Sequence, residues 1–366
     1  MKALQQGLSS AWRTTRASID LAFQFLFGGN PVISRSHGRL WVAAFCIRSQ
    51  YSTMFSAVDS KTDPDAIFAE NGVKRLTAGH LLNAFHPVNQ GNGAEFVETR
   101  LLAPLAAAIP GYEIRTDIAL KGAFGDSEWT ASSGHLLGRF MRPLFGIPAT
   151  GRVVYLRFGC FQRWSEGLVA ETILLLDLPA LMIQAGAWPL AAPFGPDLMA
   201  PAPKSGRMVW PCGDGAQSLA IVEGMISGLM RFDGSLRTMN MREFFAENFW
   251  WFGPAPIGSF RGFDDYERGH AKPFLRAFPD RVGGNHRARF GNGDFVASTG
   301  WPSIDATHKG DGWLGLAGTD RKITMRVMDF WRAQNGMLVE NWVMIDIPEL
   351  LQQIGIDLFA AQHSGG

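Results

Sequence analysis

The sequence "KITMRVMDFWRAQNGMLVENWVMID", residues 322–346, has the pattern of two β-strands joined by a tight turn. Asn-Gly at 335–336 is the strongest short hairpin signal, because both residues tolerate the positive φ of a type I′ turn. Side chains alternate between the two faces of a strand, so every second residue of the first strand shares one face. These residues are Ile323, Met325, Val327, Asp329 and Trp331. The face is apolar except for the carboxyl group of Asp329.

A two-residue turn would also set the pairing of the two strands. It would place Trp331 opposite Glu340 and Asp329 opposite Trp342, which brings two carboxyl groups and two indoles onto one apolar wall. Burial in such a wall raises the pKa of a carboxyl group, because desolvation disfavours its charged form. That shift suits a general acid/base near neutral pH. The alternative is a structural carboxyl group held by a neighbouring arginine or a backbone donor.

A second candidate lies upstream, in "DATHKGDGW" at residues 305–313. A histidine near the end of a strand can reach the rim of a pocket, so His308 is a candidate to assist Asp329. A hydrogen-bonded structural histidine is the alternative. Trp313, at the end of the same stretch, is expected to contribute to an aromatic pocket wall.

The hairpin is the second copy of an internal repeat. Residues 151–186 align without gaps to residues 320–355 at a constant offset of 169, with about eleven of thirty-six positions identical. A gap-free match of this length indicates duplication, and upstream the similarity continues with a short insertion near Trp301–Asp305. The predicted parts are an N-terminal extension (1–60), a first domain (62–190), a proline-rich linker (191–213) and a second domain (214–362).

The first copy differs from the second at the position of the candidate acid/base. Cys160 stands where the second copy has Asp329, and His135 is taken as the counterpart of His308. Glu171 corresponds to Glu340. We therefore expect a degenerate site in the first domain, formed by His135, Cys160 and Glu171.

Composition limits the classes of function. A hydrophobic content of 46% with 18% charged residues is that of a globular protein with a large core. A net charge of +1 gives no electrostatic reason to bind nucleic acid or an anionic membrane, and no run of eighteen apolar residues is free of charge and proline. Three isolated cysteines favour a reducing, cytoplasmic environment, and no spacing of histidines or cysteines predicts a protein-bound metal. The extension at 1–60 is nearly free of acidic side chains, and we expect it to be poorly ordered.

The order of elements predicts an α+β fold. Helical regions are expected at 64–85, 218–233 and 241–252, each before long antiparallel strands. A closing helix should begin after Asp346, with Glu349 completing a capping box. Such a unit wraps a strongly curved sheet around an apolar pocket.

Both copies resemble the SnoaL-like polyketide cyclases of the NTF2-like superfamily. The resemblance rests on "GHLLGRF", "FGIPATGRVVYLRF", "QRWSEGLVAE" and "LLDLPALMIQAG" in the first copy, and on "THKGDGWLG" and "ITMRVMDFWRAQNGMLVENWVMIDIPELLQQIG" in the second. It implies two tandem conical α+β barrels, each with a deep pocket. It also implies an intramolecular aldol closure without metal or organic cofactor. In the family an aspartate on the strand corresponding to 322–332 acts as acid/base with a nearby histidine, and Asp329 and His308 hold those positions.

The leading hypothesis is an acid/base enzyme that cyclises or isomerises an apolar carbonyl compound, with Asp329, His308 and Glu340 as the catalytic group. Its small hydrophobic substrate would contact Trp331, Trp342, Trp313, Val327 and Met325. One alternative is a non-catalytic ligand-binding or dimerisation protein, and a homo-oligomer is compatible with the sequence. Another is an epoxide-hydrolase-like hydrolase, which would need a carboxylate–arginine–carboxylate set around a water molecule.

Overall fold

The computed structural model describes residues 67–68, 72–206, 208–209, 213–283 and 285–359. The chain divides into two compact units, residues 1–59 and residues 60–366, and every described residue belongs to the second unit. The extension predicted at 1–60 therefore lies outside the described residues.

The first half of the second unit is built on a mixed sheet ordered β2-β1-β6-β5-β4-β3-β7. Its strands are β1 (Leu76–Ala84), β2 (Gln90–Asn92), β3 (Glu113–Phe124), β4 (Ser127–Arg139), β5 (Val153–Ser165), β6 (Leu168–Leu176) and β7 (Met208–Val209). The pairs β1–β6 and β3–β7 are parallel, and the other pairs are antiparallel. Its helical segments are η1 (Gly72–Arg75), α3 (Gly93–Val97), the π-helical η2 (Glu98–Leu102), α4 (Ala103–Ala108) and α5 (Leu178–Gln184).

The second half repeats this plan with a sheet ordered β10-β12-β13-β14-β8-β9, in which β11 also pairs with β12. Its strands are β8 (Phe245–Phe252), β9 (Ser259–Arg261), β10 (Val282–Gly283), β11 (His286–Asn292), β12 (Phe295–His308), β13 (Arg321–Gln334) and β14 (Met337–Ile345). Its helical segments are α6 (Ala216–Leu229), η3 (Leu236–Met239), η4 (Met241–Glu243), α7 (Gly262–Tyr266), the π-helical η5 (Glu267–Ala271), α8 (Lys272–Ala277), η6 (Trp313–Gly315) and α9 (Ile347–Gln353).

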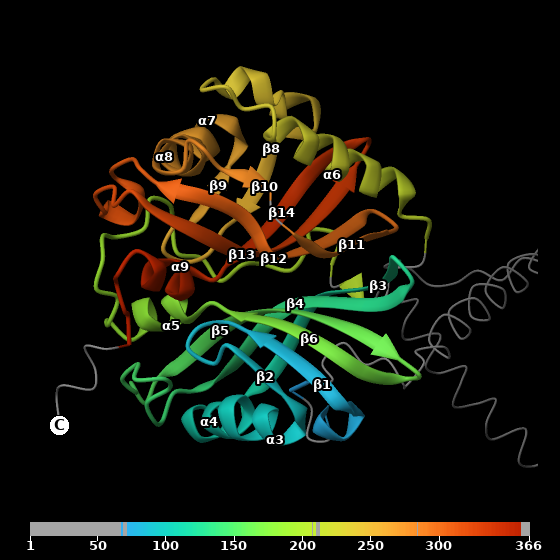
Figure 1. Ribbon diagram of the computed structural model, residues 1–366, viewed down its shortest axis with the longest axis vertical. Coiled ribbons are helices and arrows are strands. Elements are labelled where there is room, and N and C mark those ends of the chain that lie inside the picture. The colour runs from blue at the N-terminus through green and yellow to red at the C-terminus, as the bar shows by residue number, and fades with distance from the viewer. Residues whose placement is uncertain (1–66, 69–71, 207, 210–212, 284, 360–366) are drawn as a thin grey trace, which may run out of the picture. The chain divides into compact units, whose positions relative to one another are not determined.

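Helices cover one side of each sheet. Figure 1 shows α6, α7 and α8 together on one side of the second sheet, and α3 and α4 on one side of the first. The elements recur at the spacing of the sequence repeat, since β14, α9 and α7 begin at the repeat offset from the first residues of β6, α5 and α3. Both sheets have free ends in their strand order, so the described strands form no closed barrel and the expected conical barrels are open sheets backed by helices.

Two helical predictions are wrong. Residues 64–85 contain β1 where described, and residues 241–252 contain β8, whereas the helix expected at 218–233 is present as α6. β1 lies parallel to β6, and β8 lies parallel to β14. These segments are strands because each pairs with a strand that is distant in the sequence. The local spacing of apolar residues does not reveal such a pairing.

The closing helix is confirmed, and with it the cap. The carboxylate of Asp346 accepts a hydrogen bond from the backbone N–H of Glu349 at the start of α9. The reciprocal bond of a capping box is absent from the described contacts, because the Glu349 carboxylate instead accepts from Gln353 at 2.7 Å.

The same aspartates also join the two halves. Asp177 accepts a hydrogen bond from the backbone N–H of Ala255 at 2.9 Å, and Asp346 accepts one from the backbone N–H of His86 at 3.0 Å. The two acceptors are separated by the offset of the sequence repeat, and so are the two donors. Each half therefore gives the same carboxylate to the same backbone position of the other half.

Two arginines repeat this reciprocity. Arg157 donates to the carbonyl of Gly253 at 3.1 Å, and Arg326 donates to the carbonyl of Ala84 at 3.4 Å. The repeat offset again relates the two donors to each other and the two acceptors to each other. Such self-complementary exchange is the pattern of a two-fold interface.

The centre of the interface is apolar. The rings of Phe161 and Phe330 lie 5.7 Å apart between centroids, and both residues are fully buried. Gly159 allows the close approach, since a Cβ at that position would lie 3.0 Å from the sulfur atoms of Met328 and Met344.

Candidate active site in the second half

The second half encloses a cavity of about 190 Å³ between the face of its sheet and the helices α6, α7 and α8. Most of its lining is apolar. Five flexible thioether side chains contribute to it: Met225, Met230, Met239, Met241 and Met325. Methionine adapts to ligands of irregular shape, so this lining suits an apolar molecule.

The floor of the cavity is the predicted face of β13. Met325, Val327, Asp329 and Trp331 all line it. Strand alternation therefore identified this wall from the sequence, and Asp329 is the only carboxyl group among the described residues that line the cavity.

Burial governs the charge of Asp329. Asp329 is half-buried and open to the cavity, and desolvation by the surrounding protein raises its pKa to about 7. Three groups oppose this rise: a hydrogen bond from Asn341 Nδ2 to Oδ1 at 3.4 Å, and the charges of Arg289 and Arg157. The group is therefore able to exchange a proton near neutral pH.

β13 pairs with β14 as expected, but the register of the two strands differs from the prediction. Residues 335–336 form the two-residue turn, with φ values of 53° and 77°, and next to it Gln334 pairs with Met337 and Ala333 with Leu338, in the register that such a turn sets. Arg332, however, pairs with Glu340, so Val339 is the extra residue of a β-bulge. The bulge shifts the rest of β14 by one residue.

This shift changes which residues face the cavity. Asn341 lies opposite Trp331, and Val343 lies opposite Asp329, and all four line the cavity. The expected pairing of Asp329 with Trp342 is therefore wrong. The sequence of β14 gives no sign of this one-residue bulge. Regular alternation therefore placed Asn341 on the wrong face of the sheet.

Glu340 and Trp342 lie on the other face of the sheet. Glu340 forms an ion pair with Arg332 and accepts a hydrogen bond from the backbone N–H of Lys204 at 3.1 Å. The indole N–H of Trp342 donates to the carbonyl of Pro201 at 2.9 Å. Both residues hold the segment between the two halves against the second sheet, and neither lines the cavity.

His308 and Trp313 are also outside the cavity. His308 is fully buried at the end of β12, where Nδ1 lies 3.2 Å from Thr319 Oγ1 and the ring packs on Phe278. Trp313 packs edge-on against the same phenylalanine at 5.1 Å. His308 pairs with Arg321, which lies eight residues from Asp329 along β13, a distance of about 26 Å in an extended strand. The geometry therefore gives no support to the expected assistance of Asp329 by His308.

Two helical residues, rather than His308 and Trp313, complete the wall of the cavity. Tyr266 and His270, four residues apart across the junction of α7 and η5, both line it. The His270 ring stacks on Trp251 with centroids 4.1 Å apart, and burial lowers its pKa to about 3, so the ring is neutral. The pKa of Tyr266 is raised by burial and then by the charge of Asp329. The spacing of four residues indicates that Tyr266 and His270 share one face of a helix. The local sequence does not show that this face packs over the strand that carries Asp329.

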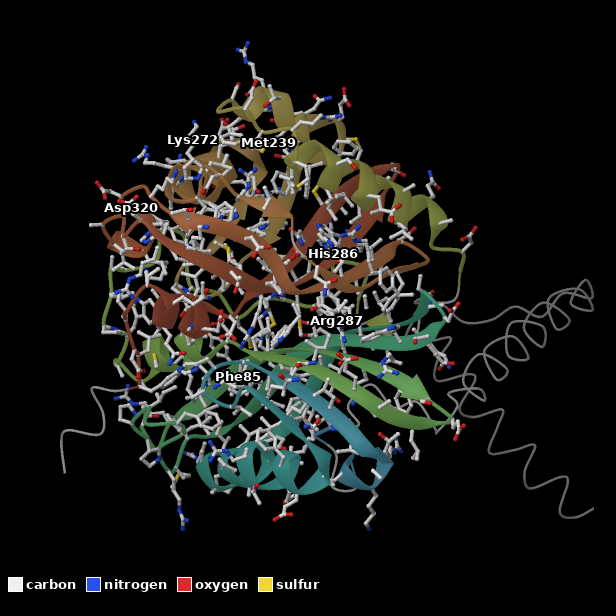
Figure 2. The ribbon with its side chains drawn as sticks, viewed as in Figure 1. Phe85, Met239, Lys272, His286, Arg287 and Asp320 are labelled. Carbon is white, nitrogen blue, oxygen red and sulfur yellow. The ribbon has the colours of Figure 1, made fainter. Side chains whose placement is uncertain are left out.

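The strand β11 separates the cavity from the first half. His286 lines the cavity, and its pKa is lowered to about 4 by burial and by the charge of Arg289. The next residue, Arg287, points to the other side and forms an ion pair with Glu171 at 2.7 Å (Figure 2). Glu171 therefore serves as a contact between the halves.

The first half has no acid/base group at the position of Asp329. Cys160 pairs with Ser132 in β4, as Asp329 pairs with Ser298 in β12. Phe158 stands where the second half has Val327, and the ring of Phe68 packs on it at 5.1 Å. Aromatic side chains thus occupy the region that is open in the second half.

His135 does not correspond to His308. His135 pairs with Arg157 in the middle of β4–β5, whereas His308 pairs with Arg321 at the end of its strand. Nδ1 of His135 lies 3.3 Å from Oδ2 of Asp117. Arg157 corresponds to Arg326 in the repeat, so the two histidines pair with positions that lie five residues apart.

The described residues were also compared with the requirements of a metal site and of a membrane-spanning helix. No group of three or more histidine, cysteine, aspartate or glutamate side chains in this part of the chain could hold a metal ion. None of the helices described is both long and apolar enough to cross a membrane.

Comparison with curated proteins finds no match. Among solved structures, AclR from Streptomyces galilaeus, named as a candidate hydroxylase, is 21% identical over 39% of this chain and 87% of its own, with a TM-score of 0.32. IdmH from Streptomyces antibioticus, named as a candidate polyketide cyclase, is 22% identical over 38% of this chain and 99% of its own, with a TM-score of 0.31. An NTF2-like protein from Burkholderia xenovorans is 14% identical over 39% and 98%, with a TM-score of 0.31. The family model of SnoaL-like polyketide cyclases matches residues 235–354, the segment that holds Asp329 and most of the cavity lining.

Proposed function

We propose that the second half is an acid/base enzyme that cyclises or isomerises an apolar carbonyl compound, in the manner of a polyketide cyclase. The observation that carries the proposal is one carboxyl group, Asp329, with a pKa of about 7 in an apolar cavity. The match of residues 235–354 to SnoaL-like polyketide cyclases supports the same reaction class. Asp329 needs only to move protons, because in a cyclisation the enolate carbon itself attacks a second carbonyl of the substrate; the proposal therefore calls for no metal or organic cofactor.

In the proposed reaction, the carboxylate of Asp329 takes a proton from the carbon next to the substrate carbonyl. The carbonyl oxygen gains the negative charge of the enolate, and a hydrogen-bond donor in a dry cavity stabilises it. The hydroxyl of Tyr266 suits this role, because it lines the cavity and has no hydrogen-bond partner among the described residues. In a cyclisation, the enolate carbon bonds to a second carbonyl carbon of the substrate, and the protonated Asp329 gives its proton to the oxygen of that carbonyl. In an isomerisation, it returns the proton to another carbon of the conjugated enolate.

An epoxide hydrolase is less compatible with the cavity. Such an enzyme would need two carboxylates and an arginine around a water molecule, and only Asp329 supplies a carboxylate among the described lining residues. A non-catalytic binding role suits the first half better, since Cys160 replaces the acid/base there.

We further infer that the chain is a tandem of two SnoaL-like domains, at 62–190 and 214–362, joined by 191–213. The support is the recurrence of elements at the offset of the sequence repeat, together with the reciprocal contacts of the aspartates and arginines between the halves.

Exchange of α-protons tests the acid/base proposal without knowledge of the natural substrate. The full-length protein is incubated in D₂O with 4-phenylbutan-2-one, and deuterium uptake is followed by NMR. Asp329→Asn should lower catalysed uptake by at least about a hundredfold, because an amide cannot shuttle the proton. Cys160→Ala is the matched control and should leave uptake unchanged. Equal uptake by the Asp329→Asn variant would refute the proposal.

A further inference from the structure

Arg281 is a charged residue of the cavity wall that the proposed reaction does not use. It directly precedes β10, and its guanidinium is held by three neighbours. Nη2 donates to the carbonyl of Leu229 at 3.2 Å and lies 3.4 Å from the sulfur of Met239, and the guanidinium carbon lies 4.8 Å from the ring centre of Phe232. The side chain is therefore held in place beside the cavity.

No carboxylate of the described chain pairs with Arg281. Other arginines of the second half do form such pairs, for example Arg326 with Asp346 and Arg332 with Glu340. Burial lowers the pKa of Arg281, yet a guanidinium remains charged at neutral pH. A half-buried cation without a counter-ion is unfavourable, and an anion bound in the cavity would offset that cost.

Asp329 does not serve as this counter-ion. The charges that lower its pKa are those of Arg289 and Arg157. Tyr266 responds to both groups, since its pKa is raised by the charge of Asp329 and lowered by that of Arg281. All three residues line the same cavity, Asp329 from the sheet, Arg281 from the residue before β10 and Tyr266 from α7.

The size of the cavity limits the molecule that could span these groups. A dry cavity of about 150 Å³ holds benzene, so about 190 Å³ accommodates one ring with a short substituent. The neutral rings of His270 and His286 add no second charge at neutral pH.

We propose that Arg281 determines substrate specificity by pairing with a carboxylate, so that the cavity takes an apolar acid. The hydrocarbon part lies among the methionines, and the carboxylate meets the guanidinium of Arg281. The position of the reacting carbonyl next to Asp329 rests on the proposed function, whereas the recognition of the acid does not.

A matched pair of probes tests the recognition directly. Binding of 3-phenylpropanoate and of 3-phenylpropanamide to the full-length protein is measured by calorimetry at low salt. The two probes have nearly the same shape and differ in charge. We expect the acid to bind at least tenfold more tightly than the amide, and Arg281→Met to abolish this preference.

Two variants separate specificity from a purely structural role. Arg281 also donates to the last carbonyl of α6, so Arg281→Met can lower the melting temperature on that ground alone. Arg281→Lys keeps a positive charge and should retain part of the preference for the acid. Asp329→Asn should keep the full preference while losing proton exchange, which distinguishes this inference from the proposed function. Equal binding of acid and amide, no binding of the acid, or an unchanged preference in Arg281→Met would each overturn the inference.

Discussion

At the scale of the residue, Asp329 shows how a costly position can support a reaction. An ionised carboxyl group in an apolar cavity has lost much of its hydration, and it is compensated by one long hydrogen bond and by the charges of Arg289 and Arg157. The folded protein therefore holds a proton on Asp329 up to a pH of about 7, whereas the unfolded chain releases it near 3.8.

That difference predicts how stability depends on pH. Because the folded state binds the extra proton, ionised Asp329 destabilises the fold increasingly as the pH rises from about 4 through 7. Asp329→Asn should raise the free energy of unfolding by on the order of 1–2 kcal/mol at pH 8 and by little at pH 4. Denaturant unfolding at both pH values measures this. A variant that is less stable at pH 8 would indicate a structural carboxyl group.

Asn341 should set the pH at which the reaction works. Its side-chain amide donates to Oδ1 of Asp329 and favours the ionised form, so Asn341→Leu should raise the pKa of Asp329 further. The pH–rate profile of α-proton exchange should then move to higher pH. Thr172→Val changes the corresponding position of the first half and should leave the profile where it is. An unmoved profile in Asn341→Leu would show that this hydrogen bond has no influence on the acid/base.

The sequence predicted one wall of the site and missed the others. Alternation in β13 is local, so it identified Met325, Val327, Asp329 and Trp331 correctly as one face. Asn341 was missed because a bulge shifts β14, and Tyr266 because it comes from a helix whose place on the sheet is set by packing. The alternation of residues within a strand predicts which side chains share a face. The other walls of the cavity depend on how segments distant in the sequence pack together.

At the scale of the element, the N-cap of α9 is also a contact between the two halves. Its N-cap residue, Asp346, accepts from the backbone N–H groups of Glu349 and His86 and pairs with Arg326 at 3.2 Å. The cap and its position in the sequence were predictable, since a capping aspartate is a local signal. The contacts with the other half were not, because they depend on which surfaces meet.

The same carboxylate should therefore matter more than an ordinary cap. Asp346→Ala removes the cap and leaves the largely buried Arg326 without this partner, so we expect a loss of about 2–4 kcal/mol in the free energy of unfolding. Ser235→Ala removes the exposed cap of η3 and should cost at most about 1 kcal/mol. Chemical unfolding of both variants makes the comparison. Equal losses would mean that the contacts of Asp346 across the halves contribute nothing.

At the scale of the whole second unit, repetition in the sequence is repeated in the contacts. The constant offset of the repeat predicted two similar halves, and the described elements recur at that spacing. The interface could not be read from the repeat alone. Its apolar centre at Phe161 and Phe330 is formed by positions that alternation places on the outer face of a strand, where a sequence gives no partner.

The second half expressed alone should form a homodimer through the surface that normally contacts the first half. Residues 191–366 would expose Phe330, Met328 and Met344, together with the paired Arg326 and Asp346. Because the interface is nearly two-fold, a second copy of this half offers the same surface to the first. We therefore expect a dimer whose fraction rises with protein concentration, as measured by sedimentation or light scattering. Met328→Lys places a charge at the centre of the interface and should weaken that dimer, whereas Lys272→Met, on the outer helix α8 (Figure 2), should not. A stable monomer with an unchanged melting temperature would show that the halves do not depend on each other, because the apolar centre would then be tolerated in water.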